Sequence, residues 1–590
     1  MTGRVAVIGG GSSGLACIKT CLDERLEPVC FESSDDIGGL WRFKENPEAD
    51  RASIYHSVII NTSKEMMCFS DFPIPGHFPN YMHNSLIMDY FQMYADRFQL
   101  TKHIRFNTKV LQVKQRSDFS HSGQWDVETE NRDGMKEKHI FDAVLICIGH
   151  HCHPNMPLHD FPGIDTFKGT YFHSRDYKTP EDWRNKKVVV IGIGNSGGDI
   201  AVELSRVTKQ LYLSTRRGAW ILHRVADNGL PLDMVGTRVD NFLRRNLPFG
   251  LSCSMRERKL NQRFDHSLYN LQPKHRYGSN SVAQSETWLF TCLMTDVLVV
   301  LLIIVNINLR VNSQHPTVND ELPNRILSGT VQVKPNIRRF QGSSVEFDDG
   351  SVVEDVDLVV FATGYRFSFP FLASHVVSVS DNKASLYKFV FPPELERPTL
   401  AIIGLVQPLG AIMPISEIQA RWATRVFKGC LKLPSVASMQ KDIQCKKDMM
   451  AKRYVTSQRH TIQVDYVNYM DQIAELLGVK PNIPKLLLTD PRLGLSVVFG
   501  PTSPYQYRLR GPGKWAGARQ AILTQWDRVA QPMQTRPCND PKPKSSFMWP
   551  LILSAVAVGL AVYINRNNLP AFLHDPTALL DKMKVYLPAH

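Results

Sequence analysis

The stretch Arg4-Val5-Ala6-Val7-Ile8-Gly9-Gly10-Gly11-Ser12-Ser13-Gly14 decides the fold of this chain. Its apolar residues predict a buried parallel strand, and Gly9-x-Gly11-x-x-Gly14 predicts a tight turn into a helix. Backbone N–H groups at such a helix N-terminus bind a pyrophosphate, which a Cβ at the glycines would obstruct. The next strand ends at Glu32, where an acid binds the ribose hydroxyls of an adenine dinucleotide. The sequence therefore predicts an α/β dinucleotide-binding unit.

A second unit of the same kind follows later in the chain. The strand Lys187–Ile191 leads into Gly192-x-Gly194-x-x-Gly197, and the next strand ends in Ser214-Thr215-Arg216-Arg217. Here arginine occupies the position that Glu32 holds in the first unit. An acid would repel a 2′-phosphate, whereas a guanidinium binds one bidentately. The first unit therefore suits FAD or NAD and the second suits NADPH, although two arginines at a strand end are also compatible with a solvated edge.

Composition and charge restrict the function classes. The chain has 590 residues, 43% of them hydrophobic, and a net charge of +13. The sequence contains no zinc-finger spacing, RNP-like strand or long basic run. The charge therefore favours anionic cofactors and a membrane surface over nucleic acid. The eleven cysteines form no C-x-x-C pair, which favours a reducing compartment and argues against a disulfide reductase. Neither a metal-ligand cluster nor a convincing catalytic triad is present.

The order of the strands predicts how the units are connected. Ala143–Gly149 and Asp357–Gly364 both resemble strands that return to a parallel sheet, so we expect the first unit to be interrupted by the second and then resumed. The stretch 221–275 lacks a clear period and is expected to be an irregular insert. The expected domains are the first part of the FAD-binding domain (1–153), the NADPH-binding domain (154–330), the second part of the FAD-binding domain (331–445), a helical membrane-associated region (446–546), a transmembrane anchor (547–564) and a tail (565–590).

Two apolar stretches are candidates for membrane segments. Residues 547–564 carry no charge and have Trp549 and Tyr563 near their ends, as expected of a short transmembrane helix. A buried C-terminal helix is the alternative. Residues 288–305 are also apolar but have Asp296 at their centre, which costs about 2.5–3.5 kcal/mol on insertion scales. For this second stretch, membrane insertion, a buried strand pair and an exposed patch all stay open.

Three further motifs carry a resemblance to a known family. They are Phe167-Lys168-Gly169-Thr170-Tyr171-Phe172-His173-Ser174-Arg175-Asp176-Tyr177, Phe361-Ala362-Thr363-Gly364-Tyr365 and Asn61-Thr62-Ser63-Lys64-Glu65-Met66. With both glycine fingerprints, they make the chain resemble the flavin-containing monooxygenases, also called dimethylaniline (N-oxide-forming) monooxygenases. The resemblance covers residues 3–276 and 313–564. It is strongest to the vertebrate branch associated with Baeyer–Villiger oxidation.

The resemblance implies a fold, cofactors and a reaction. The fold would be two Rossmann-like domains, the NADPH domain inserted in the FAD domain, with a C-terminal helical region and an anchor in the endoplasmic reticulum membrane. NADPH would reduce FAD, and dioxygen would give a C4a-(hydro)peroxyflavin that oxygenates amines or sulfides, or converts ketones to esters. The substrates would be small and lipophilic, and an oligomer is compatible with the family.

The resemblance also implies roles for individual residues. Asn61 would act in catalysis by holding the oxygenating flavin through a hydrogen bond, and His173 would have a structural role at the domain hinge. The residues expected to bind FAD are Gly9, Gly10, Gly11, Ser12, Ser13, Gly14, Glu32, Leu40, Trp41, Asn61 and Thr62. Those expected to bind NADPH are Ile60, Asn61, Gly192, Gly194, Ser196, Gly197, Gly198, Asp199, Arg216 and Arg217.

The chain departs from the family pattern at residues 277–312 and in the tail after Ile564. We interpret 277–312 as translated non-family sequence, such as a retained intron or a splice variant. Two alternatives to a monooxygenase stay open. One is an NADPH oxidase that releases hydrogen peroxide, and the other is a catalytically impaired form of the enzyme caused by this insertion.

Overall fold

The structure is a computed structural model that describes residues 3–48, 51–246, 249–274, 314–454 and 460–536. Met1–Met533 forms one compact unit, and a second unit begins at Gln534. The helices and strands considered below all belong to the first unit.

The first sheet is built on the N-terminal strand. It has five parallel strands in the order β22-β7-β1-β2-β3, with bounds Leu400–Ile402, Ala143–Ile146, Arg4–Ile8, Glu27–Phe31 and Ile104–Arg105. In β1, Ala6 pairs with Val29 on one side and with Val144 on the other. Because β22 comes after the second sheet in the sequence, the chain leaves this sheet and returns to it, in agreement with the expected interruption.

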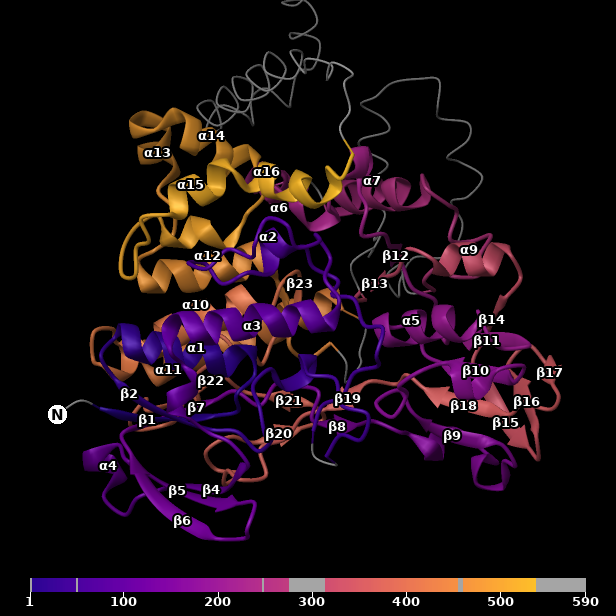
Figure 1. The fold of residues 1–590 in the computed structure, drawn as a ribbon, viewed down its shortest axis with the longest axis horizontal. Coiled ribbons are helices and arrows are strands. Elements are labelled where there is room, and N and C mark those ends of the chain that lie inside the picture. The colour runs from indigo at the N-terminus through magenta and orange to yellow at the C-terminus, as the bar shows by residue number, and fades with distance from the viewer. Residues whose placement is uncertain (1–2, 49–50, 247–248, 275–313, 455–459, 537–590) are drawn as a thin grey trace, which may run out of the picture. The chain divides into compact units, whose positions relative to one another are not determined.

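Helices cover one face of this sheet. They are α1 (Ser12–Asp23), α3 (Asn84–Phe98) and α10 (Met413–Phe427) (Figure 1). At the other side lies an antiparallel sheet made of β4 (Thr108–Gln115), β5 (Trp125–Asn131) and β6 (Lys136–Phe141). Because both faces are covered, β1 is apolar after its first residue, and Val5, Ala6, Val7 and Ile8 are buried.

The second sheet is also parallel, in the order β14-β11-β10-β18-β9. Its strands are Val331–Lys334, Gln210–Ser214, Lys187–Ile191, Leu358–Phe361 and Thr170–His173, and α5 (Asn195–Leu204) follows β10. The domain boundary expected at residue 330 is wrong, since β14 and β18 are strands of this second sheet. An apolar run identifies a buried strand but does not state which of two similar sheets it joins.

The stretch 221–275 also differs from the expected irregular insert. It contains the short strand β12 (Ile221–Leu222), which pairs with β13 (Thr317–Val318), and the helices α6 (Arg238–Asn246) and α7 (Phe249–Asn261). Polar contacts attach α6 to the rest of the unit: Arg238 forms a bidentate ion pair with Asp471, at 2.8 and 3.0 Å. This contact joins residues 233 positions apart, so no local pattern in the sequence reveals it.

The C-terminal part of the unit is helical, as expected. Its helices are α11 (Val436–Arg453), α12 (Tyr466–Leu477), α13 (Ile483–Thr489), α14 (Pro491–Phe499), α15 (Ala518–Leu523) and α16 (Gln525–Ala530). Arg528 of α16 donates two hydrogen bonds, of 2.8 and 2.7 Å, to Glu65 of α2 (Lys64–Met67), and the Tyr505 hydroxyl donates a third at 3.0 Å. We call these three residues the Glu65 clamp. Glu65 is fully buried, so the clamp ties the C-terminal helices to the N-terminal half.

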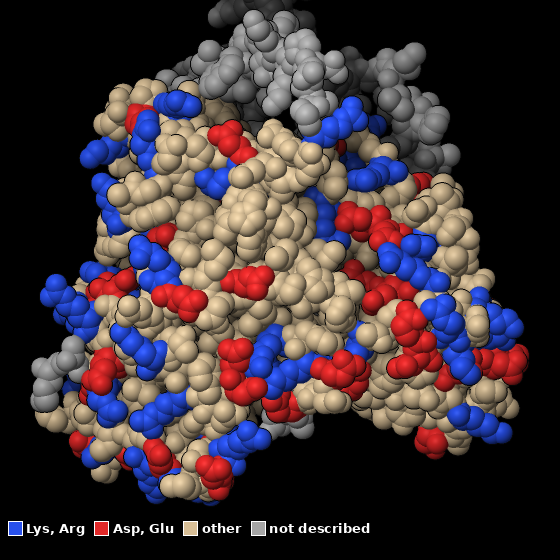
Figure 2. Space-filling model, viewed as in Figure 1, with Lys and Arg blue, Asp and Glu red and all other residues tan. Residues whose placement is uncertain are grey.

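Within the described ranges, no helix combines the length and apolar character needed to cross a membrane. The candidate anchor at 547–564 and the stretch 277–312 lie outside the described residues. Figure 2 shows Lys and Arg mixed with Asp and Glu over the described part of the face in view.

Candidate active site

The turn after β1 forms the first cradle, which we define as Gly9–Gly14. Gly9 has φ +103°, and a Cβ on Gly14 would lie 1.9 Å from the Gly9 carbonyl oxygen. Helix α1 therefore packs directly on the turn. Its N-cap, Gly11, makes no side-chain capping bond, and no acidic residue lies in the first turn. The first N–H groups of this helix are thus left to bind an anion, and the cradle fits the pyrophosphate of a dinucleotide.

Glu32 is fixed at the edge of this cradle. Its Oε2 accepts a hydrogen bond from the Gly10 N–H at 2.6 Å, and its Oε1 accepts two from Ser34, backbone N–H and hydroxyl, both at 2.8 Å. The side chain is buried. The carboxylate is therefore held in place by the protein alone, at the position where an acid binds ribose hydroxyls.

The second cradle, Gly192–Gly197, repeats this backbone. Gly192 has φ +104°, and a Cβ on Gly197 would lie 2.0 Å from the Gly192 carbonyl oxygen. The N-cap of α5, Gly194, also makes no side-chain capping bond. Arg216 and Arg217 follow β11, are exposed, and make no side-chain hydrogen bond or ion pair with the described residues. Two free guanidinium groups next to an anion-binding turn fit a phosphorylated dinucleotide.

One cavity of about 2300 Å³ joins the two cradles. This volume exceeds the 300–1,000 Å³ that is typical of a site for one small ligand. The predicted site residues on its wall are Gly9, Gly11, Ser12, Ser13, Glu32, Leu40, Trp41, Ile60, Asn61, Thr62, Gly192, Gly194, Ser196, Gly197, Asp199, Arg216 and Arg217.

Three predicted site residues do not line this cavity. They are Gly10, Gly14 and Gly198. Gly10 faces Glu32, Gly14 faces the carbonyl oxygen of Gly9, and a Cβ on Gly198 would lie 3.2 Å from Thr317. Each of these glycines is explained by close packing beneath its cradle.

The loop 59–63 brings Asn61 to the cavity wall. The Ile60 N–H donates to the Met82 carbonyl at 2.9 Å, and the Ser63 N–H donates to Asp233 Oδ2 at 2.7 Å. Between these bonds, the Asn61 side chain accepts a hydrogen bond from Arg224 at 2.6 Å. The loop is thus fixed on both sides of the residue predicted to act in catalysis.

Asp199 also joins two segments of the site. It lines the cavity, but Oδ2 accepts a hydrogen bond from the Tyr55 hydroxyl at 2.7 Å and Oδ1 accepts one from Asn319 at 2.8 Å. Burial raises the pKa of this carboxyl. With both oxygens engaged, Asp199 attaches α5 to the segment that contains Tyr55.

Three further side chains act at the site without any signal in the sequence, namely Tyr55, Arg224 and Asp233. No motif surrounds any of them, and Arg224 and Asp233 lie in the stretch taken as irregular. Burial raises the pKa of Asp233 to about 6, although its bond from the Ser63 N–H opposes the shift. Only their contacts across the structure identify these residues.

His173 has a structural environment. Its Nδ1 accepts a hydrogen bond from the Arg175 N–H at 3.1 Å, so its Nε2 carries the proton and donates to the Gly364 carbonyl at 2.9 Å. Burial lowers the pKa of the imidazole. A neutral ring with both nitrogens engaged agrees with the structural role proposed for it.

Comparison with known proteins gives consistent matches. A family model described as flavin-binding monooxygenase-like matches residues 2–305 and 286–566. The two matched segments overlap at residues 286–305, so the break in the match falls inside the stretch 277–312.

Several curated relatives are similar over most of their length. Flavin-containing monooxygenase 5 of Oryctolagus cuniculus is 57% identical over 92% of this chain and 96% of its own length. The protein of the same name from Homo sapiens is 56% identical over 90% of this chain and 93% of its own length. Dimethylaniline monooxygenase [N-oxide-forming] 2 of Rattus norvegicus is 48% identical over 96% of this chain and 100% of its own length.

Solved structures share the fold. The S-allyl-L-cysteine S-oxygenase of Allium sativum has a TM-score of 0.58 at 22% identity, covering 90% of this chain and 99% of that one. An ε-caprolactone-bound cyclohexanone monooxygenase has a TM-score of 0.52 at 17% identity, covering 81% and 98%.

Proposed function

Since this chain belongs to the flavin-binding monooxygenase-like family, we propose that it oxygenates small lipophilic amines, sulfides or ketones in the cavity that joins its two cradles. The chain is an oxidoreductase that uses FAD and NADPH, with dioxygen and a small molecule as substrates. The choice between heteroatom oxygenation and ester formation is part of the proposal.

The observation that carries the proposal is the position of Asn61. It lies on the wall of the same cavity as Glu32, beside the first cradle, and Arg216, beside the second. Bound FAD, once reduced by NADPH, supplies the activation of dioxygen. Asn61 would donate a hydrogen bond into this cavity, where a fixed polar contact can stabilise charge that develops in the reaction.

The other residues of the cavity would bind and orient the ligands. Glu32 would hold the ribose of FAD and the N-terminus of α1 its pyrophosphate, while Arg216 and Arg217 would hold the 2′-phosphate of NADPH. Leu232 and Val235 add apolar wall beyond the cradles, which suits a lipophilic substrate. Both reaction classes are proposed because the neighbours of known structure include an S-oxygenase and a cyclohexanone monooxygenase.

The test is the variant Asn61→Ala, assayed with a thioether and then with a ketone. We expect the purified variant to stay yellow and to consume NADPH but to release hydrogen peroxide in place of sulfoxide or ester. Asn324→Ala, an exposed asparagine on α9 (Leu322–Leu327), is the matched control. Unchanged product yield in Asn61→Ala would contradict the role of Asn61. Peroxide as the main product of the unmodified protein would instead identify an NADPH oxidase.

We also propose, from the sequence and the family resemblance, that residues 547–564 anchor the protein in the endoplasmic reticulum membrane. The support is their length without charge and the aromatic residues Trp549 and Tyr563 near the ends. The full chain should stay in the membrane pellet after alkaline carbonate extraction, and a chain shortened to Met533 should not. Complete extraction of the full chain would contradict an anchor.

A further inference from the structure

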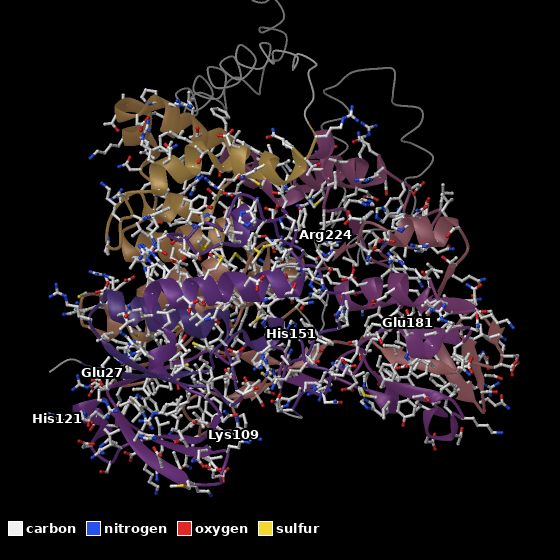
Figure 3. The ribbon with its side chains drawn as sticks, viewed as in Figure 1. Glu27, Lys109, His121, His151, Glu181 and Arg224 are labelled. Carbon is white, nitrogen blue, oxygen red and sulfur yellow. The ribbon has the colours of Figure 1, made fainter. Side chains whose placement is uncertain are left out.

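A segment of the NADPH-binding part crosses to the loop that carries Asn61. Within residues 221–234, Arg224 contacts the Asn61 side chain at 2.6 Å, and Asp233 accepts the Ser63 N–H at 2.7 Å. Arg224 is labelled in Figure 3, near the middle of the view. The contact joins the two halves of the cavity at the residue to which the proposed function assigns catalysis.

The contact fixes the orientation of the Asn61 amide. A guanidinium only donates hydrogen bonds, so the Asn61 atom that faces Arg224 must be the carbonyl oxygen Oδ1. The Nδ2 amino group makes no hydrogen bond with the described residues, and Asn61 lines the cavity. Asn61 therefore offers a donor, rather than an acceptor, to a bound ligand.

Arg224 is itself held by Asp320. The backbone N–H and Nη1 of Arg224 both donate to this carboxylate, each at 2.8 Å. The two side chains are 14% and 34% exposed, so solvent only partly screens the ion pair. Three groups are thus linked by hydrogen bonds in one series: the Asp320 carboxylate, the Arg224 guanidinium and the Asn61 amide.

This series of hydrogen-bonded groups is connected to the second cradle. Asp320 follows β13, whose Val318 N–H donates to Asn195 Oδ1 at 2.9 Å, and the neighbouring Asn319 donates to Asp199 at 2.8 Å. Asn195 and Asp199 both belong to α5. The carboxylate that holds Arg224 is therefore positioned by the helix that begins at the second cradle.

We propose that Arg224, held by Asp320, is a positioning residue that turns the Asn61 amide so that Nδ2 faces the cavity. The inference rests on the proposed function, because it explains how the donor of Asn61 is aimed. Without Arg224, the amide is free to rotate and to present Oδ1, which cannot donate.

The test compares Arg224→Gln and Asp320→Asn with the control Arg206→Gln. Arg206 pairs with Glu321, next to Asp320 in sequence, but both side chains are about half exposed. We expect peroxide formed per NADPH to rise about tenfold in the first two variants, the lower range for loss of a charged hydrogen bond, with flavin content and the NADPH KM unchanged within about twofold. Hydrogen exchange of the backbone amides in residues 60–63 of the FAD-bound protein should also be faster. Should Arg224→Gln not fold, Asp320→Asn carries the test, because it keeps the shape of the side chain.

A double variant separates this inference from the proposed function. If Arg224 acts through Asn61, adding Arg224→Gln to Asn61→Ala should not raise peroxide release further. An additive rise would overturn the inference. The inference would also be overturned if Asn61→Ala raises peroxide release per NADPH but Arg224→Gln and Asp320→Asn both leave peroxide release and backbone hydrogen exchange unchanged. An unchanged yield of oxygenated product per NADPH in Asn61→Ala would overturn the proposed function itself.

Discussion

The two cradles have nearly the same backbone but opposite charges beside it. The first glycine has φ +103° in one and +104° in the other, and the last glycine leaves no room for a Cβ in either. The difference begins just after the next strand. Glu32 directly follows β2, whereas the matching position after β11 is Thr215, and the arginines expected at that position, Arg216 and Arg217, come next. The turn therefore fits a dinucleotide in both units, and the charge of the residues just after the next strand is what we propose distinguishes FAD from NADPH.

The two selecting positions also differ in how they are held. Glu32 is buried and accepts hydrogen bonds from Gly10, Ser33 and Ser34, whereas Arg216 and Arg217 are exposed. A carboxylate fixed in advance loses little freedom on binding and suits a cofactor that stays bound. Exposed arginines must become ordered at each binding event, which suits a ligand that is exchanged in every turnover.

The same substitution in both cradles gives the largest expected effect. An alanine at Gly14 or Gly197 would place Cβ within about 2 Å of a carbonyl oxygen, and displaced backbone should lower ligand affinity about 100-fold or more. Gly14→Ala should be colourless, whereas Gly197→Ala should stay yellow but bind NADPH weakly. Flavin absorbance and NADPH titration measure the two losses.

Gly3→Ala is the matched control for this pair, since its Cβ would make only ordinary contacts, the nearest at 3.4 Å. Equal loss of flavin in Gly14→Ala and Gly197→Ala would show that the cradles are not separate sites.

The next largest effect is expected from removing the two arginines beside the second cradle. In the double variant Arg216→Ala, Arg217→Ala we expect the KM for NADPH to rise about 10- to 100-fold, as expected for the loss of charge-assisted hydrogen bonds. The KM for NADH should hardly change, because NADH lacks the 2′-phosphate. Steady-state kinetics with both nucleotides test this, with exposed Arg184→Ala as control. Parallel changes for NADPH and NADH would remove the phosphate assignment.

A smaller effect is expected from Glu32→Gln. Glutamine keeps one acceptor oxygen, but its amino group must face the N–H of Gly10 or of Ser34, so one buried donor loses its partner. That loss costs about 1–3 kcal/mol, and FAD affinity should fall about tenfold, as measured by flavin release on dilution. FAD affinity equal to that of the unmodified protein would mean that Glu32 does not contact the cofactor.

The smallest effect concerns the residues that follow the two return strands, His150 after β7 and Tyr365 after β18. Burial lowers the pKa of His150 to about 4 and raises that of Tyr365 to about 12. The unfolded chain therefore binds the His150 proton first, and this residue removes stability as pH falls from about 6.5 toward 4. Between pH 7.5 and pH 5, the unfolding temperature of His150→Gln should fall by about 1–2 °C less than that of the unmodified protein.

Tyr365→Phe is the control for this prediction, because its hydroxyl stays protonated throughout that range. Identical unfolding curves for His150→Gln and the unmodified protein at both pH values would contradict the role of His150.

The parts of the fold that were predictable are those written in short stretches of sequence. The strand–turn–helix units, Glu32 and the return strands each depend on residues close together in the chain. The membership of β14 and β18 in the second sheet was not predictable, because it depends on which of two similar edges a strand meets. Likewise, α6 is fixed by the contact of Arg238 with Asp471, which no local pattern records.

The site residues also divide into those that a short stretch of sequence predicts and those that depend on distant contacts. Glycines, Glu32 and the arginines follow from spacing, and the catalytic role of Asn61 was assigned by the family resemblance. Tyr55, Arg224 and Asp233 act through partners more than 100 residues away. Such contacts become visible only when the chain is folded.

The Glu65 clamp has a practical consequence for protein production. Arg528 lies close to Met533, where the compact unit ends, yet it neutralises a carboxylate only four positions after Asn61. A chain cut before Arg528 to improve yield would leave Glu65 in the interior with only the Tyr505 hydroxyl as partner among the clamp residues, an arrangement that is strongly destabilising. Crystallisation trials with shortened versions should therefore keep every residue through Met533.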